Sequence, residues 1–252
     1  MITAAIIQAR MSSSRLPGKS MIKICSKPII EHVFDRVKSC KLIDDVILAT
    51  SIDPSDDILE EWAVNNSINC YRGSLDDVLD RFYNASIFYK VDNIVRITAD
   101  CPLVDPQTID EVILNFKKGN YDLYSLGGNF PDGLDCQVFS FKSALEVAWS
   151  NAILASEREH VCPYIENNPR IFKLGYLEKF LTESTIRITL DHPEDLELIK
   201  KIYENLYYSN PLFGIESIFK FLDHNPELLE INAGIIRNEG YLKSLSTDNT
   251  KN

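Results

Sequence analysis

The sequence predicts an α/β protein in which a mostly parallel sheet lies between two layers of helices. Short apolar runs with the length of buried strands alternate with longer segments whose apolar residues recur at helical spacing. In the first half of the chain this alternation gives the order β-α-β-α-β-α-β-α, which implies right-handed crossovers between parallel strands. The 252 residues, 45% of them hydrophobic, suffice for a core that needs neither disulfides nor metals.

Each element of the first half has its own local signal. The helix over Lys27–Ser39 carries Ile29, Val33 and Val37 on one face, and Pro54–Asn65 begins with a Pro-Ser-Asp-Asp start signal. The predicted strands are Thr3–Gln8, Asp45–Thr50, Ile68–Tyr71 and Asn93–Thr98, and the other predicted helices are Leu75–Tyr89 and Asp105–Lys118.

The pattern changes near residue 122, where two short strands flank a turn-rich segment and predict a small β-rich insertion. We assign residues 1–245 to one domain, with 122–140 as an arm or an insertion beside the site and 246–252 as a flexible tail. Such an arm would allow a homodimer, although the sequence also permits a monomer. The further predicted strands are Asp122–Ser125, Cys136–Phe139, Ile171–Tyr176 and Thr185–Thr189, and the further helices are Ser140–Ser150, Ser156–Asn167, Pro193–Tyr207 and Ile215–Asn225.

The composition excludes several classes of function. The net charge of −11, from 26 basic and 37 acidic residues, argues against a general nucleic-acid surface, which needs a basic face. None of the six cysteines has the spacing of a zinc site, and we expect reduced thiols. No apolar run has membrane-spanning length and no signal peptide is visible, so we expect a cytoplasmic protein.

A basic loop follows the first strand. Arg10, Arg15 and Lys19 bring three cations to one edge of the sheet, where open α/β sheets bind ligands. Ser13, Gly18 and the backbone N–H groups of the loop can surround an anion such as a triphosphate. The loop matches neither a Walker P-loop nor a dinucleotide-binding turn, and the alternative is a solvated, charged connection.

Two distant aspartates could hold a divalent cation. Asp100 follows the fourth strand and is held by Pro102, and Asp191 ends another predicted strand before a helix. Mg²⁺ prefers one or two carboxylates together with substrate phosphates and water. The alternative for Asp191 is a helix N-cap, because Asp before His-Pro-Glu is a good helix start.

The stretch Ala9–Lys19 resembles the signature loop of the sugar-acid cytidylyltransferases, and its match is closer still to the SpsF-type branch named for spore-coat polysaccharide synthesis. The Asp-x-Pro motif at Asp100 and the Asp-x-Pro-Glu-Asp motif at Asp191 look like the two metal carboxylates of that family, in the same order. Cys101 departs from the Glu of many sugar-acid enzymes, whereas Cys is common in the SpsF-type branch. The resemblance implies a Rossmann-like, nucleotide-diphospho-sugar-transferase-like fold and a nucleotide site of Ala9, Arg10, Ser13, Arg15, Gly18, Lys19, Arg72, Thr98 and Asp100.

By this resemblance the chain is a magnesium-dependent nucleotidyltransferase. It would transfer CMP from CTP to a sugar acid or a similar acidic acceptor and release pyrophosphate, for cell-surface polysaccharide or glycan synthesis. Asp100 and Asp191 would hold Mg²⁺ or Mn²⁺, while Arg10, Lys19 and Asp100 act in catalysis. Such transfers depend on positioning and electrostatics and need no covalent enzyme intermediate.

Three other functions stay open. A phosphorylated small molecule, such as a sugar phosphate or phosphoglycerate, could replace the sugar acid as the acceptor. A metal-dependent glycosyltransferase of similar architecture would normally carry an Asp-x-Asp motif, whereas Thr98-Ala99-Asp100 has one Asp. An idle nucleotide-binding scaffold is disfavoured by the presence of Lys19, Asp100 and Asp191 together.

The acceptor site is predicted from the later part of the chain. Arg158 could grip an acidic acceptor by a forked contact, and Arg187 lies near Asp191 in the sequence. The alternatives are an Asp-Gly turn for the paired carboxylates and a packed or solvated helix residue for the histidine. The acceptor candidates are Asp132, Asp135, Arg158, His160 and Arg187.

Overall fold

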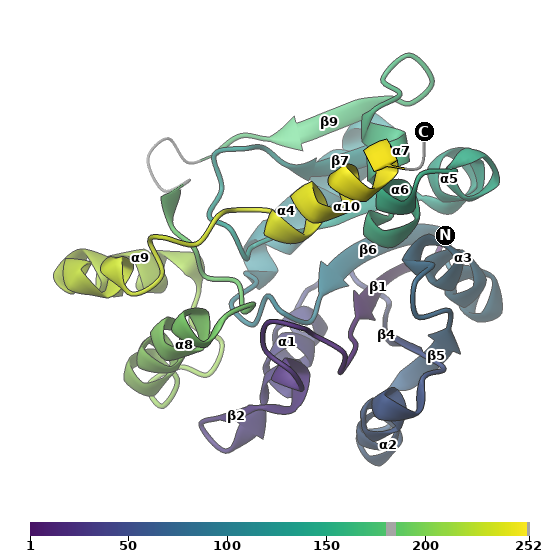
Figure 1. Cartoon of the computed structure of the whole chain (residues 1–252). Helices are drawn as coiled ribbons and strands as arrows, with labels where there is room; N and C mark the ends of the chain where they lie inside the picture. Colours follow the sequence, from purple (N-terminus) through teal and green to yellow (C-terminus); the bar gives the residue numbers. More distant parts are fainter. Residues whose placement is uncertain (180–184, 251–252) are drawn as a thin grey trace.

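The computed structural model describes residues 1–179 and 185–250 of the chain. It has a seven-stranded sheet in the order β5-β4-β1-β6-β8-β7-β9 with helices against both faces (Figure 1). β8 runs antiparallel to β6 and β7, and the other neighbouring strands of this sheet are parallel. The predicted α/β fold with a mostly parallel sheet is therefore confirmed. The strands are β1 (Thr3–Gln8), β4 (Asp45–Ser51), β5 (Asn69–Gly73), β6 (Asn93–Thr98), β7 (Leu123–Leu126), β8 (Gln137–Ser140) and β9 (Leu174–Leu177).

Helices follow the strands along the chain, and a small hairpin interrupts the first connection. This hairpin pairs β2 (Lys23–Ile24) with β3 (Lys27–Pro28). In the described part of the chain no helix combines the length and the apolar composition that a membrane span requires. The helices are α1 (Ile29–Lys38), α2 (Asp57–Asn65), α3 (Val78–Tyr89), α4 (Pro106–Gly119), α5 (Glu146–Asn151), α6 (Ala155–His160), α7 (Pro163–Glu166), α8 (Pro193–Leu206), α9 (Ile215–His224) and α10 (Glu239–Thr250).

The sheet separates two hydrophobic cores, because successive residues of a strand point to opposite faces. Ala5 and Ile7 of β1 pack into the core that includes α1, α4 and α8. Ala4 and Ile6 of the same strand pack into the core that includes α3 and α5. A strand covered on both faces needs a continuous apolar run, which is the pattern of the β1 sequence.

The second half differs from the prediction in three places. The strands assigned to an insertion, β7 and β8, join the main sheet, and Phe130 between them is buried. The helix predicted from 156 to 167 is divided into α6 and α7 at Val161, whose φ of 71° is incompatible with an α-helix. Within 185–189 the structure has one isolated bridge, between Arg187 and Asp132, in place of the predicted strand.

The C-terminal end also differs from the prediction. We expected residues 246–252 to be a flexible tail, but α10 continues through Thr250 and packs beside α6 (Figure 1). The backbone N–H of Ser156 donates a hydrogen bond to Asp248 Oδ1 at 3.2 Å. Residues 251–252 lie outside the described part of the chain.

Gly133 is the position at which the fold demands glycine most strongly. Its φ is 106°, and a Cβ built there would lie 2.4 Å from the backbone nitrogen of Thr189. We expect Gly133→Ala to lower the free energy of unfolding by about 2 to 4 kcal/mol, through backbone strain and a clash with rigid backbone. Urea denaturation of the variant measures this loss.

Gly128→Ala is the matched control, because a Cβ at Gly128 meets no atom within 4 Å. We expect it to change the unfolding midpoint little. Equal stabilities of the two variants would contradict the account of Gly133.

Candidate active site

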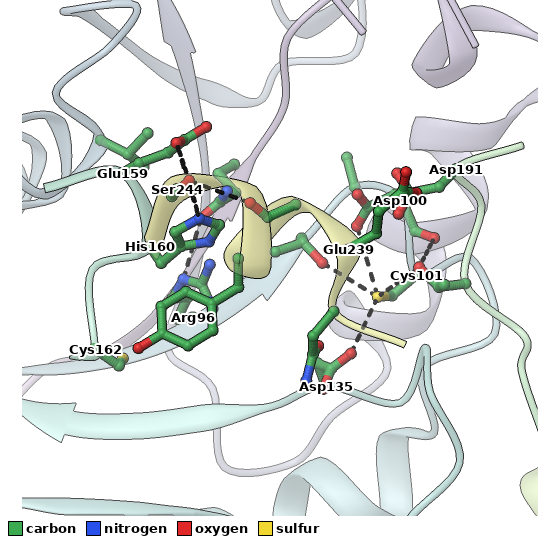
Figure 2. A pocket seen from close by; sticks show the side chains of 18 of the residues that line it. Arg96, Asp100, Cys101, Asp135, Glu159, His160, Cys162, Asp191, Glu239 and Ser244 are labelled. Atoms are coloured by element: carbon green, nitrogen blue, oxygen red, sulfur yellow. Dashed lines mark hydrogen bonds and ion pairs between the residues drawn. The ribbon is translucent and has the colours of Figure 1, made fainter. Parts of the chain in front are cut away.

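A cavity of about 870 Å³ opens at the carboxyl ends of β1 and β6. The basic loop after β1 forms one wall, and residues of α6, α7 and α10 form the opposite wall. Figure 2 shows Asp100 and Asp191 at one end of this cavity and His160, Arg96 and Ser244 at the other, where the yellow ribbon of α10 passes. The cavity lies where open α/β sheets usually bind their ligands.

Lys19 joins the two predicted metal carboxylates. Its Nζ lies 2.8 Å from Asp100 Oδ2 and 2.7 Å from Asp191 Oδ1, and it also donates to the carbonyl oxygen of Leu190 at 2.9 Å. Burial acts to lower the pKa of Lys19, but the two carboxylates raise it above its usual value. Burial acts to raise the pKa of Asp100, but Lys19 holds it at about 2. All three groups are therefore charged at neutral pH. Three segments that are far apart in the sequence meet in this cluster.

The other two cations of the basic loop also line the cavity and face carboxylates. Arg15 lies 2.9 Å from Asp191 Oδ2 and 3.2 Å from Glu239 Oε2, which belongs to α10. Arg10 lies 3.4 Å from Glu159 Oε1 on α6. The loop therefore presents three cations to one cavity, and acidic side chains balance their charge.

The remaining residues of the predicted nucleotide loop have different positions. Ala9 and Ser13 line the cavity, and Ser13 Oγ also accepts a hydrogen bond from the backbone N–H of Leu16 at 3.3 Å. Gly18 does not line the cavity. It adopts a left-handed conformation, with φ of 70°, and its N–H donates to the carbonyl oxygen of Met11 at 3.1 Å. Gly18 shapes the turn that brings Lys19 to the site.

The Asp100–Asp191 pair fits a divalent cation. Both side chains offer carboxylate oxygens to one shared cation, the Lys19 ammonium. Mg²⁺ characteristically takes such oxygens and completes its shell with water and substrate phosphates. No group of three or more His, Cys, Asp or Glu side chains within 1–179 and 185–248 is arranged to hold a metal by itself. Further ligands would therefore come from the substrate or from water.

Arg187, an acceptor candidate, forms ion pairs with two buried carboxylates. It is 8% exposed and forms a forked pair with Asp195, with Nε–Oδ1 and Nη2–Oδ2 distances of 2.9 Å. Its Nη1 lies 2.7 Å from Asp132 Oδ2. Asp195 in turn accepts hydrogen bonds from the backbone N–H groups of Asp191 and His192. Arg187 therefore orients the segment that carries Asp191. Asp191 is not the N-cap of α8, because His192 holds that position and Asp195 accepts a hydrogen bond from its backbone N–H.

The two carboxylates of the predicted acceptor turn do line the cavity. Burial, with a smaller contribution from Asp135, raises the pKa of Asp132 to about 6. Asp135 is exposed to the cavity, and the buried Sγ of Cys101 lies between it and Asp100, 4.0 Å from Asp135 Oδ2. Thr98, at the end of β6, lines the cavity and contacts Cys101 Sγ at 3.1 Å.

Arg72 and Arg158 are outside the cavity, contrary to our prediction. Arg72 donates to the carbonyl oxygen of Ser51 at 2.7 Å and pairs with Glu60 on α2 at 2.7 Å. Arg158 forms a forked pair with Asp77, at the start of α3. Each arginine has satisfying partners on a neighbouring helix, so neither turns toward the cavity. Arg81 of α3, in contrast, lines the cavity, although it is only 1% exposed.

His160 lines the cavity and connects α6 to α10. Its Nε2 lies 3.0 Å from Ser244 Oγ, and the Ser244 hydroxyl donates to Glu159 Oε2 at 2.7 Å. Burial lowers the pKa of His160. Its ring also meets that of Tyr241 edge to face, with a centroid distance of 5.1 Å. The histidine therefore packs the C-terminal helix against the site wall.

The sequence interpretation missed two contributors to this site. One is α10, from which Glu239, Tyr241 and Ser244 reach the cavity. The other is Arg96 on β6, whose position in a buried strand was the available signal because a charged residue there interrupts an apolar run.

The account of Arg187 predicts a large effect on stability. We expect Arg187→Met to lower the free energy of unfolding by about 3 to 5 kcal/mol, because it leaves buried carboxylates without a partner. Lys142→Met serves as the control, since Lys142 is 79% exposed in its pair with Glu146 and should change stability by less than about 1 kcal/mol. Denaturant unfolding of both variants tests this difference, and an Arg187→Met protein of wild-type stability would refute the buried-pair role.

Comparisons with known proteins identify the family of this chain. Residues 4–218 match the cytidylyltransferase family model. An uncharacterised protein of Methanocaldococcus jannaschii is 42% identical over 232 residues, which span 91% of this chain and 94% of that protein. The spore coat polysaccharide biosynthesis protein SpsF of Bacillus subtilis is 32% identical over 229 residues, 88% of this chain and 94% of its own length.

Solved structures extend the comparison. A cytidylyltransferase from Leptospira borgpetersenii superposes with a TM-score of 0.85 at 32% identity, over 91% of this chain and 97% of that one. The CMP:2-keto-3-deoxy-manno-octonic acid synthetase, solved in complex with CTP, shares the fold with a TM-score of 0.61 at 15% identity, over 81% of this chain and 99% of that one. The resemblance drawn from the basic loop and the two aspartate motifs is confirmed, and the chain belongs to the cytidylyltransferase family.

Proposed function

We propose that this chain transfers CMP from CTP to a sugar acid and releases pyrophosphate. The observation that carries the proposal is the convergence of Lys19, Asp100 and Asp191, with Arg10 and Arg15 beside them, in one cavity. Its relatives support the choice of substrates: SpsF is named for spore coat polysaccharide biosynthesis, and the octonic acid synthetase of the same fold was solved with CTP.

The cations of the basic loop suit a triphosphate. Arg10, Arg15 and Lys19 can stabilise the charge that develops on the leaving pyrophosphate, because fixed cations in a partly desolvated cavity act more strongly than they would in water. Their present partners, Glu159 and Glu239 among them, hold these side chains in place before the phosphates arrive. The acceptor oxygen then attacks the α-phosphorus in line, and the bond to the β-phosphate oxygen breaks.

The two aspartates complete the nucleotide half of the site. Asp100 and Asp191 would hold Mg²⁺, which supplies charge neutralisation at the phosphate oxygens. Lys19, between the two carboxylates, would then move its ammonium toward the phosphates or share the carboxylates with the ion. Asp195 fixes the backbone of Asp191 and so keeps that carboxylate directed at the site.

Removal of either carboxylate tests the catalytic assignment. We expect Asp100→Asn and Asp191→Asn each to reduce pyrophosphate release at least about 100-fold, because charge at the transfer centre is lost. Asp223→Asn, an exposed residue of α9, is the control and should retain full activity. Circular dichroism should show an intact fold in all three variants, and full activity of either site variant would remove the assignment.

The nucleotide is tested by thermal stabilisation. A ligand present at 100 times its dissociation constant stabilises the folded state by about 2.7 kcal/mol. We expect CTP with Mg²⁺ to raise the melting temperature of the wild type more than ATP, GTP or UTP does, and Lys19→Met to remove most of that rise. Equal stabilisation by all four nucleotides would count against a cytidylyltransferase, and stabilisation by a nucleotide-sugar alone would favour a glycosyltransferase.

A further inference from the structure

The cavity has a second polar end, built on Arg96 of β6. Arg96 and Thr98 point to the same face of the strand, so Arg96 lies about 7 Å before the strand end that leads to Asp100. Figure 2 shows it near His160 and Cys162, apart from the Asp100–Asp191 pair. Ser125, which pairs with Gln137 across β7 and β8, and Tyr176, which pairs with Ser125 across β7 and β9, also line the cavity.

Neutral side chains hold the Arg96 guanidinium in place. Its Nε donates to Gln8 Oε1 at 3.1 Å, and its Nη1 donates to Gln137 Oε1 at 2.6 Å. Gln137 is itself oriented, because its Nε2 donates to Glu166 Oε1 at 3.0 Å. Both amides are anchored on strands, Gln8 at the end of β1 and Gln137 at the start of β8. The guanidinium is therefore preorganised on the rigid sheet.

The charge of Arg96 is not balanced by an ion pair with a carboxylate, unlike the charges of four other cations that line the cavity. Arg10, Arg15, Lys19 and Arg187 each lie within 4.0 Å of a carboxylate oxygen. Within the described residues, the polar partners of Arg96 are the two amide oxygens. A guanidinium has five N–H groups, so two are committed and three are left.

The surroundings of Arg96 favour an anionic ligand. Burial raises the pKa of Glu166, against the opposing effects of Arg96 and of the hydrogen bond from Gln137. A carboxyl with a raised pKa is protonated, and therefore uncharged, at a higher pH. Glu166 therefore balances the positive charge of the guanidinium less than an ordinary carboxylate would. An arginine with three N–H groups left for a ligand, at the wall of a cavity, is suited to a carboxylate or a phosphate, whose oxygens accept hydrogen bonds from a guanidinium.

We propose that Arg96, held by Gln8 and Gln137, is the subsite that binds the acid group of the acceptor. This inference rests on the proposed cytidylyl transfer, since it gives the cavity two anion sites with different tasks. The basic loop holds the phosphates of the nucleotide, and Arg96 holds the oxyanion of the acceptor in the same cavity. The acceptor is therefore an acid, and a neutral sugar of the same shape is rejected because it leaves Arg96 buried without its partner.

The test compares an acid with its neutral analogue. The probes are 2-keto-3-deoxy-manno-octonic acid and its amide, and glycerol phosphate serves as a phosphorylated probe. Isothermal titration measures binding of each probe, and pyrophosphate release with CTP and Mg²⁺ gives the Michaelis constants of acceptor and nucleotide. The variants are Arg96→Met and Arg96→Lys, and Arg170→Met, at an exposed arginine outside the cavity, is the matched control.

We expect Arg96→Met to weaken acid binding and raise its Michaelis constant about 10- to 100-fold, with that of CTP unchanged. Arg96→Lys should recover part of this loss, because it restores the charge without the fork, and it also serves if Arg96→Met fails to fold. The preference of the wild type for the acid over the amide should collapse in Arg96→Met and persist in Arg170→Met. Arg96-dependent binding of the sugar acid identifies a carboxylate as the ligand, and Arg96-dependent binding of glycerol phosphate alone identifies a phosphate.

Two outcomes separate this inference from the proposed function. If CTP stabilises the protein and pyrophosphate is released, but the Arg96 variants keep the wild-type preference for the acid, the subsite is wrong and cytidylyl transfer stands. If CTP neither binds nor reacts while acid binding still depends on Arg96, the subsite stands and cytidylyl transfer falls. A rise in the Michaelis constant of CTP equal to that of the acceptor would place Arg96 in the nucleotide site and overturn the inference.

Discussion

The Lys19 ammonium, shared by Asp100 and Asp191, is the contact on which the organisation of the site depends. Two carboxylates that lie close enough to contact the same ammonium group repel each other when no cation lies between them. Burial strengthens this repulsion. Lys19 supplies that cation from the loop after β1 and also binds the carbonyl oxygen of Leu190. One side chain thereby fixes the first loop, the turn after β6 and the segment before α8 relative to one another.

The surrounding structure keeps these three segments rigid. Asp195 binds the backbone N–H groups of Asp191 and His192, and Arg187 connects Asp195 to Asp132 in the turn before β8. Asp195, at the centre of this second network, is fully buried, while Arg187 and Asp132 line the same cavity as the Lys19 cluster. The charges that maintain the geometry therefore lie directly behind and beside the charges that a substrate can reach.

The sequence was sufficient for the parallel half of the sheet and for the centre of the site. Buried parallel strands are continuous apolar runs, and Lys19 and Asp100 lie in the segments that follow two of them, β1 and β6. Asp191 was recognised from its Asp-x-Pro-Glu-Asp motif. Residue type and chain position were less informative for charged side chains whose ion-pair partners decide whether they reach the cavity. Arg72 and Arg158 look like anion ligands in the sequence, but Glu60 and Asp77 are long-range or cross-element partners that no local pattern shows. Helix α10 escaped notice because hydrogen bonds such as His160–Ser244 anchor it, in place of a wide apolar face.

The late position of helix α10 in the sequence determines when the cavity is completed during synthesis. This helix leaves the ribosome after every strand of the sheet, yet Glu239 and Ser244 complete one wall of a cavity that opens at the carboxyl ends of β1 and β6. The sheet and the Lys19 cluster can assemble while the chain is still being synthesised, since domains fold as their residues emerge. The wall that holds Arg15 through Glu239 closes only afterwards. A nascent chain that still lacks α10 therefore carries an open cavity, without the wall to which Glu239 and Ser244 contribute.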